Sequence, residues 1–361
     1  MFGQQAAGRF AGRGDGFGAA ANPNPNNDKP CQPAPQDSVS QLKFAPPSAH
    51  DATGSKFLAA SSWDGQVICY EHDGAGNTKL AKNAGHPTTS PALCCDWHTD
   101  GDKIFAGFGD NSAQCLDLNT GALTQMAQHD APIKNIIWCK DYQMLITGSW
   151  DKTVKFWSPG DPTPKLSLDL PDRCYTMDMA GKYLVCGCAE RKIRIFDVST
   201  QSVVKDELSP LKYQTRCVSV FPEGDGYAIG SIEGKVGVQY FQETAQNKNF
   251  SFRCHRGEGA QQHDVYAVNC IAFNEKEKTF ATCGSDGAYN FWDKRNKQRL
   301  KAFKKMPEPI TCGTFSADAR IFAYASCYDW HKGIDGYNPQ ASKSIHLHGV
   351  LPAEIQPKNR R

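Results

Sequence analysis

A unit of about 40 to 45 residues recurs through most of this 361-residue chain, and this repeat limits the possible folds more than any other feature. In each unit an apolar stretch, a turn and a second stretch follow one another, as in "LITGSWDKTVKFW" (145–157) and "TFATCGSDGAYNFWD" (279–293). The small residues before the turns are Ser61, Gly107, Gly148, Gly187, Gly230, Gly284 and Ala325. Their spacings of 46, 41, 39, 43, 54 and 41 residues define seven consecutive units.

The units are predicted to be built from strands. Their apolar residues alternate, or run continuously over a few positions, and Gly, Asp and Asn bound them. Turns of the Gly-Ser-x-Asp type and endings such as Trp157-Ser, Phe196-Asp and Trp292-Asp are typical of WD40 repeats. A single four-stranded blade cannot bury both of its faces, whereas seven blades packed radially can. We therefore predict an all-β fold, a seven-bladed WD40 β-propeller spanning residues 28–349.

The two ends of the chain differ from the repeats. Residues 1–27 are rich in Gly, Ala and Asn with a few Phe-Gly pairs, and we predict a disordered tail because they offer little apolar surface to bury. The seventh unit lacks a fourth strand. The simplest closure uses residues 28–36, "DKPCQPAPQ", whose prolines suit an edge strand, although its register stays open. Residues 350–361 are expected to form a short basic tail.

Composition excludes several classes of protein. The formal net charge is +2, so any anion-binding role requires a local patch. No apolar run approaches the roughly 20 residues of a membrane helix, and the N-terminus lacks a signal-peptide core, so neither a membrane association nor secretion is expected. The fifteen cysteines contain no CxxC pair, which indicates reduced and mostly buried thiols in the cytosol or nucleus.

One unit contains a set of residues that could suggest hydrolysis. His129, Ser149, Asp151 and Trp157 occur together in the third unit. Buried polar groups must be paired, and resemblance to the WD40 family implies that such residues form a structural hydrogen-bond network between a loop and a turn. We interpret the set as structural, because most other units lack it.

Other chemical sites are not expected. His263 and Ser285, ahead of Trp292, resemble a partial second copy of the network. His346 and His348 lie on one face of a predicted strand, but no third metal ligand accompanies them. No nucleophile elbow, Walker loop, dinucleotide loop or HExxH motif occurs. The sequence therefore predicts a protein that is not an enzyme and has no metal, cofactor or small-molecule substrate.

Two insertions interrupt the regular repeat. One lies within residues 250–269, where the spacing reaches 54, and the other is the turn from Cys327 to Ser342. Loops between blades share a face with the turns between second and third strands, so both insertions should lie on one face of a propeller. The residues that we expect to bind a partner there are Arg253, Arg256, Trp330, Lys332 and Tyr337. The alternative is two solvated loops whose aromatic residues pack locally.

Four stretches resemble a specific family. "FRCHR" (252–256), "YAVNCIAF" (266–273), "GSDGAYNFWDK" (284–294) and "FAYASCYDWHKGIDGYNPQ" (322–340) are similar to the nuclear-pore-associated mRNA export factors. A relative of that family, the mitotic checkpoint WD-repeat protein that binds Bub kinases, shares the first three stretches. The resemblance covers residues 37 to 350, and the fourth stretch distinguishes the export factors.

The resemblance implies a non-enzymatic adaptor. Members of the family dock on a motif called GLEBS in a Phe-Gly nucleoporin, contribute to mRNA export and spindle assembly, and can contact single-stranded nucleic acid. By position, Arg256, Trp330 and Lys332 would form the partner-binding face, supported by Arg253 and Tyr337. The expected location is the nucleus and nuclear pore, with shuttling to the cytoplasm, and RNA binding would be weak and salt-sensitive. The alternative function is a kinetochore adaptor that binds GLEBS-like motifs of checkpoint kinases.

Overall fold

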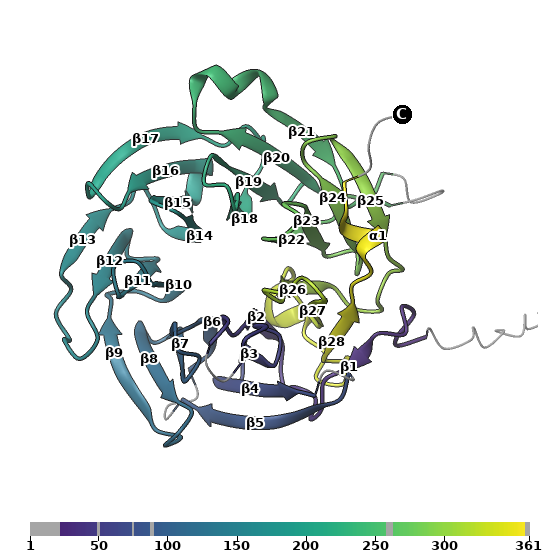
Figure 1. Cartoon of the computed structure of the whole chain (residues 1–361), viewed down its shortest axis with the longest axis horizontal. Helices are drawn as coiled ribbons and strands as arrows, with labels where there is room; N and C mark the ends of the chain where they lie inside the picture. Colours follow the sequence, from purple (N-terminus) through teal and green to yellow (C-terminus); the bar gives the residue numbers. More distant parts are fainter. Residues whose placement is uncertain (1–21, 49–50, 74–75, 87–89, 258–262, 358–361) are drawn as a thin grey trace, which may run out of the picture.

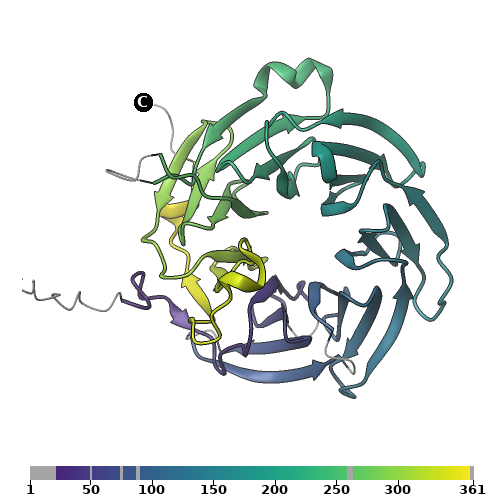
Figure 2. The same cartoon turned by 180° about the vertical axis from the view of Figure 1, so that it is seen from behind.

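The computed structural model describes residues 22–48, 51–73, 76–86, 90–257 and 263–357. Seven four-stranded antiparallel sheets stand around a central axis, which confirms the predicted seven-bladed propeller (Figure 1). Neighbouring strands of each sheet follow one another in sequence, except at the closing blade. Seen from behind, the ring shows the same succession of blades (Figure 2).

Each blade begins with a strand at the axis and ends with one at the rim. The first blade contains β2 (Val39–Phe44), β3 (Phe57–Ser62), β4 (Gln66–His72) and β5 (Thr78–Gly85). The second contains β6 (Ala92–Trp97), β7 (Lys103–Phe108), β8 (Ser112–Asp117) and β9 (Leu123–Gln128). The third contains β10 (Ile133–Cys139), β11 (Met144–Ser149), β12 (Thr153–Trp157) and β13 (Leu166–Asp169). The fourth contains β14 (Cys174–Ala180), β15 (Tyr183–Cys188), β16 (Lys192–Asp197) and β17 (Ser202–Leu208).

The remaining blades follow the same order. The fifth contains β18 (Thr215–Val220), β19 (Gly226–Ser231), β20 (Lys235–Tyr240) and β21 (Phe250–Arg253). The sixth contains β22 (Val268–Phe273), β23 (Phe280–Gly284), β24 (Tyr289–Asp293) and β25 (Gln298–Ala302). The seventh contains β26 (Ile310–Phe315), β27 (Ile321–Ser326), β28 (Ser344–Gly349) and β1 (Lys29–Pro30). Short helices are η1 (Ala189–Arg191), η2 (Glu243–Lys248), η4 (Gly333–Gly336) and α1 (Pro352–Ile355), and no described helix has the length and apolarity needed to cross a bilayer.

The hydrophobic core lies between blades rather than within them. Second strands such as β7 and β15 are buried at nearly every position, whereas the rim strand β17 is mostly exposed. The buried cluster around Trp97 and Phe108 joins the first blade to the second, and the cluster around Phe291 and Phe322 joins the sixth to the seventh. Each blade therefore buries its faces only when both neighbours are present, as in other radial repeats.

The N-terminal segment closes the ring. Residues 29–30 pair with β28 as the fourth strand of the seventh blade, and the edge position suits Pro30, which has no N–H to donate (Figure 1). Nearby, the Asn26 side chain donates to the carbonyl of Lys304 at 3.0 Å and accepts from its N–H at 2.9 Å. The register left open by the sequence is Lys29 opposite Leu347 and Pro30 opposite His346.

Both predicted tails are shorter than expected where the structure describes them. The disordered tail predicted for residues 1–27 includes residues 22–27, but the two hydrogen bonds of Asn26 hold this segment against the sixth blade. At the other end, the basic tail predicted for residues 350–361 contains α1. It buries Glu354 and Ile355, and the Ile355 carbonyl accepts from the Thr279 hydroxyl at 3.0 Å. The predicted tail at residues 1–21 lies outside the described residues.

Candidate protein-binding face

Antiparallel blades sort their connections onto two faces. The turns between second and third strands share one face with the loops that lead to the next blade, because first and third strands run in the same direction. Trp63, Trp150 and Trp330 lie in turns of this kind, and we call their side of the ring the tryptophan face. The opposite face carries the turns between first and second strands, such as residues 140–143. Both insertions found in the sequence therefore lie on the tryptophan face.

The long turn of the seventh blade folds around the phenol of Tyr328. This hydroxyl donates to the carbonyl of Gly333 at 2.9 Å and accepts from the N–H of Lys332 at 3.1 Å. A side chain that holds two backbone groups of its own turn fixes the turn's shape. The Lys332 ammonium is exposed and has no ion pair within the described part of the chain.

Asp329 anchors the base of the turn to neighbouring blades. Its carboxylate accepts hydrogen bonds from Ser285 and Asn269 of the sixth blade and from His331, and Arg216 of the fifth blade donates to its carbonyl at 3.5 Å. Burial favours the neutral acid, but the hydrogen bonds of Ser285 and His331 outweigh it and hold the pKa of Asp329 below its usual range. These hydrogen bonds hold the Asp329 carboxylate in place, and with it the base of the long turn.

Trp330 lies in an aromatic stack on this face. Its ring stacks on Trp63 of the first blade, with centroids 4.5 Å apart, and on Tyr337, with centroids 5.2 Å apart. The Tyr337 hydroxyl donates to Asp37 at 3.3 Å, which ties the stack to the segment before the first blade. The indole N–H of Trp330 is buried without a partner in the described structure. Trp330 and Tyr337 therefore present one supported aromatic surface.

The two predicted arginines occupy different environments. Arg256 is half-buried, and its guanidinium donates to the Glu233 carbonyl at 2.7 Å while its Nε has no hydrogen-bond partner in the described structure. Arg253 is exposed at the end of β21. Among the described residues no hydrogen bond or ion pair joins either arginine to the turn at residues 327–343. The predicted group thus divides into a compact unit, Trp330, Lys332 and Tyr337, and two arginines on the next loop.

Exposed apolar side chains concentrate on the tryptophan face. Of the eleven large apolar side chains that are exposed in the described structure, five lie in its turns and loops: Trp150, Tyr213, Ile232, Val265 and Ile334. Only Tyr142 and Leu351 lie on the opposite face, and the other four are on rim strands. Exposed large apolar side chains mark interaction surfaces when they gather on one face, so this face is a better docking candidate than the opposite one.

At its centre the face opens into a cavity of about 390 Å³ at the mouth of the axial channel. Trp63, Trp150 and Trp330 line it together with the cationic side chains of Lys134, Arg173 and Arg216 and several polar residues. Burial lowers the pKa of the Lys134 ammonium. The mouth combines aromatic surface with positive charge, which suits acidic or aromatic groups of a partner.

Sequence reasoning missed several of these residues. Trp63 and Trp150 follow the small residue and Ser in the turns "SSWDG" and "GSWDK", so they occupy equivalent positions in the first and third units. Trp150 is exposed in its turn and Trp63 lies against Trp330, so a tryptophan at this turn position was a signal that the sequence offered. Arg216 and Lys134 lie on the inner strands β18 and β10, each within apolar sequence. No local sequence pattern indicated that both side chains line the same cavity.

The residues His129, Ser149, Asp151 and Trp157 form hydrogen bonds around a fifth residue, Thr147. The Thr147 hydroxyl contacts His129 Nε2 at 2.7 Å and accepts from Trp157 Nε1 at 2.8 Å, while His129 Nδ1 lies 2.7 Å from Asp151. Ser149 instead donates to the Ala131 carbonyl at 2.9 Å and accepts from the Asp151 N–H at 3.0 Å. These hydrogen bonds join the loop before the third blade to the strands and turn of that blade, and the His129 side chain is fully buried.

The expected second copy of this network uses a different histidine. His263 is exposed, whereas His255 Nδ1 lies 2.8 Å from Asp286 and its Nε2 lies 3.0 Å from the Thr282 hydroxyl, which also accepts from Trp292. The prediction was wrong because the long loop contains two histidines and only His255 stands at the entrance to the blade. Ser285 instead binds Asp329 at the base of the long turn.

The two histidines of β28 have different hydrogen-bond partners. His346 accepts or donates one hydrogen bond with Ser344 at 2.9 Å and stacks on Tyr324. His348 lies between the carboxylates of Asp28 and Glu354, at 2.8 and 2.9 Å. Each histidine is thus bound within the fold.

Comparison with known proteins agrees with this fold. The family described as "WD domain, G-beta repeat" matches residues 77–117, 122–158 and 253–293. The "Poly(A)+ RNA export protein" of Schizosaccharomyces pombe is 41% identical over 331 residues, covering 91% of this chain and 92% of the relative. "Protein RAE1" of Arabidopsis thaliana is 42% identical, covering 96% and 97%, and the "mRNA export factor" of Xenopus tropicalis is 40% identical, covering 97% of each. With this identity over nearly its whole length, the chain belongs to the Rae1/Gle2 mRNA export factor family of WD40-repeat proteins.

Proposed function

We propose that this chain is a non-enzymatic adaptor in mRNA export that docks through its tryptophan face on the GLEBS motif of a Phe-Gly nucleoporin. The relatives are named as RNA export proteins, and the observation that carries docking is the concentration of exposed apolar side chains on one face. Such a function would locate the chain in the nucleus and at the nuclear pore, with passage to the cytoplasm.

The residues of the long turn suit the centre of such an interface. Trp330 is supported from both sides by Trp63 and Tyr337, so little side-chain freedom is lost when a partner covers it. Lys332 adds an uncommitted positive charge beside the stack, and Arg256 offers an Nε that still lacks a partner in the described structure. Rigid aromatic residues beside cations are the usual energetic anchors of protein interfaces.

Calorimetric titration with a GLEBS peptide tests this proposal. We expect Trp330→Ala to weaken binding by roughly 30-fold, since truncation of a central aromatic anchor costs about 2 kcal/mol. Lys332→Glu should weaken it about tenfold by removing an attractive charge and adding a repulsive one. Tyr142→Ala, which removes an exposed aromatic side chain from the opposite face, is the matched control and should bind like the wild type.

The outcomes separate the site from the function. If the wild type binds but neither Trp330→Ala nor Lys332→Glu changes the affinity, the assignment of the face fails. If the wild-type chain does not bind a GLEBS peptide at all, the docking function fails. Unchanged binding of a checkpoint-kinase motif by Lys332→Glu, together with absent nucleoporin binding, would support the kinetochore alternative.

Weak contact with single-stranded RNA is a second activity of the same face. The exposed ring of Trp150 at the cavity mouth offers a platform for bases, and Lys332, Arg173 and Arg216 supply positive charge on the same face. With about three phosphate contacts, affinity should fall roughly twentyfold between 50 and 200 mM salt. Fluorescence anisotropy of a labelled oligoribonucleotide measures this, and a salt-independent affinity would exclude the phosphate contacts.

A further inference from the structure

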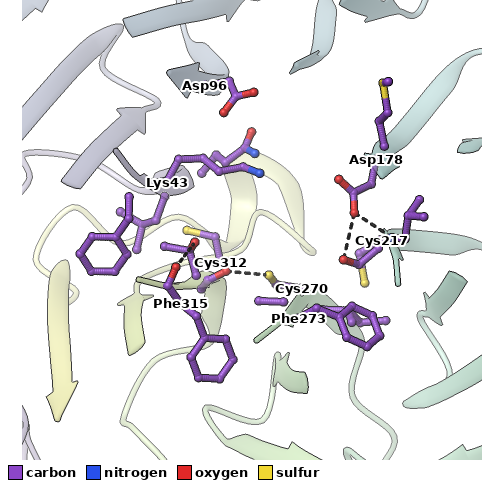
Figure 3. A pocket seen from close by; sticks show the side chains of 18 of the residues that line it. Lys43, Asp96, Asp178, Cys217, Cys270, Phe273, Cys312 and Phe315 are labelled. Carbon is purple, nitrogen blue, oxygen red and sulfur yellow. Dashed lines mark hydrogen bonds between the residues drawn. The ribbon is translucent and has the colours of Figure 1, made fainter. Parts of the chain in front are cut away.

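Cys270 is a partly exposed cysteine that borders the axial channel. All fifteen cysteines are free thiols, and only Cys254 and Cys270 are not fully buried. Cys270 lies on β22, the innermost strand of the sixth blade, and lines a cavity of about 530 Å³ formed by the first strands of the blades. Figure 3 looks into this cavity, where Cys270 lies near Cys312, Cys217 and the charged residues Lys43 and Asp178. A small reagent that enters the channel therefore meets this thiol.

A second thiol stands behind it. Cys270 is directly opposite Cys283 of β23 in the antiparallel ladder. Opposite residues in such a ladder have Cα atoms about 4.5–5.5 Å apart, which is within the range that a disulfide spans. The Cys270 thiol donates to the Gly313 carbonyl at 3.3 Å, and a Cβ added to Gly313 would lie 3.1 Å from the Cys283 Sγ. Both sulfur atoms therefore approach Gly313.

The surroundings of the pair favour the thiolate of Cys270. A hydrogen bond from the Cys283 thiol lowers the pKa of Cys270, and the nearby Lys43 ammonium assists it, while burial and the Asp178 carboxylate oppose it. Burial also disfavours the charged form of Lys43, but Asp96 and Asp178 outweigh it and raise the pKa of Lys43, so the cation persists. Burial and the neighbouring Cys270 raise the pKa of Cys283. The pair thus contains one nucleophilic sulfur and one protonated sulfur.

We propose that Cys270 is an oxidation site for peroxides and that Cys283 is its resolving partner. The Cys270 thiolate attacks one oxygen of the peroxide, whose O–O bond breaks, and a sulfenic acid and hydroxide result. The Cys283 sulfur then attacks the sulfenic sulfur, the S–S bond forms, and the displaced hydroxide takes the Cys283 proton and leaves as water. Two thiols and hydrogen peroxide become one disulfide and two waters.

Selectivity follows from the other cysteines. Burial raises the pKa of Cys254, the other partly exposed thiol. Cys217 and Cys312 border the same cavity, but only 7% and 5% of their surfaces are exposed and burial raises their pKa. Cys270 alone combines access with a favoured thiolate, and this inference does not depend on the docking function.

Mass spectrometry of the reduced full-length chain tests the proposal. In a brief iodoacetamide pulse at pH 7.5, Cys270 should be alkylated at least about tenfold faster than Cys254, because thiolate fraction controls the rate. After hydrogen peroxide treatment, non-reducing digestion should yield a peptide linked through Cys270 and Cys283 that dithiothreitol separates. Both measurements use the wild-type chain, so they do not depend on a variant that folds.

Two variants assign the roles. In Cys283→Ser the linked peptide should disappear and a Cys270 sulfenic acid should be trapped by dimedone, whereas Cys254→Ser should behave like the wild type. Faster alkylation of Cys254 than of Cys270, or no oxidation at Cys270 after peroxide, would overturn the site. A sulfenic acid that persists at Cys270 in the wild-type chain would overturn the role of Cys283.

Discussion

At the residue scale, Thr147 shows how one hydroxyl holds a blade together. It lies between the ring nitrogens of His129 and Trp157, at 2.7 and 2.8 Å, and its side chain is completely buried. Thr282 occupies the same position between His255 and Trp292 in the sixth blade. A threonine that recurs in two blades between the same kinds of partner serves the architecture, because its hydroxyl is the hydrogen-bond partner of a buried indole N–H and of a buried imidazole Nε2.

Replacing Thr147 by valine should therefore be costly. The substitution conserves shape but leaves the buried Trp157 N–H and His129 Nε2 without partners, which we expect to lower the free energy of unfolding by about 2–4 kcal/mol. Urea denaturation monitored by tryptophan fluorescence measures the change. Thr124→Val, at an exposed position on the rim strand β9, is the control and should change stability by less than about 0.5 kcal/mol. Equal effects of the two variants would contradict the role of the hydroxyl.

At the scale of elements, His348 joins three segments that are distant in sequence. Its two ring nitrogens contact Asp28, next to the closing strand β1, and Glu354 in α1, while Lys301 lies 3.6 Å from Glu354. The phenols of Tyr289 and Tyr324 also donate to Asp28, at 3.0 and 2.8 Å. Burial disfavours the imidazolium, but the two carboxylates outweigh it and raise the pKa of His348.

The raised pKa of His348 determines how its contribution to the free energy of unfolding changes with pH. Because the folded chain holds the proton of His348 more tightly than the unfolded chain, its stabilisation is complete below the unfolded pKa of about 6.5 and is lost as pH rises through the higher folded value. The stability difference between wild type and His348→Gln should thus shrink as pH rises from 6 to 9. Urea denaturation across this range measures it, and a difference that grows with pH would contradict the account.

His346 provides the opposite case on the same strand. Burial lowers its pKa, so protonation favours the unfolded chain and its neutral form is required for stability. Stability that depends on His346 should be lost as pH falls through 6.5 toward the lower folded value. In His346→Gln the loss of stability between pH 7 and 5 should therefore be smaller than in the wild type, as the same denaturation series shows. As pH rises, the stability difference between wild type and variant should therefore shrink for His348→Gln and grow for His346→Gln.

At the scale of the whole molecule, the ring depends on a segment from its far end. Removal of residues 1–36 deletes β1, Asp28 and Asn26, exposes the edge of β28 and leaves the phenols of Tyr289 and Tyr324 without their acceptor. We expect the thermal unfolding midpoint to fall by several degrees. In domains of about 150–250 residues, each kcal/mol of lost unfolding free energy lowers the midpoint by about 2–4 °C. Differential scanning calorimetry measures the change. Removal of residues 1–21 alone is the control and should leave the midpoint unchanged.

The sequence predicted the architecture because a repeat is a local signal that returns seven times. Turns such as "GSWDK" and alternating strands such as "KTVKFW" each carry the same information, so errors in one unit did not matter. Details set by contacts between distant residues were harder to predict. The order of residues 22–27 depends on the backbone of Lys304, and the choice of His255 over His263 depends on which one reaches Asp286.

The candidate face was predictable only in part for the same reason. Trp330, Lys332 and Tyr337 were chosen because they lie in one long insertion, and the structure brings the two aromatic rings together. Trp63 comes from a blade that is nearly 270 residues away in sequence, yet its ring lies against Trp330 because the propeller closes there. A face assembled from seven turns is a property of the closed ring and not of any single segment.

Hydrogen–deuterium exchange of the chain with and without a GLEBS peptide tests most directly whether the tryptophan face is the docking face. Slower exchange in the complex is predicted for the turn at residues 327–343 and for the turns and loops that carry Trp63, Tyr213 and Ile232. The turns of the opposite face, at residues 98–102 and 140–143, should exchange equally in both states. Protection confined to the opposite face or to the rim strands would contradict the proposal.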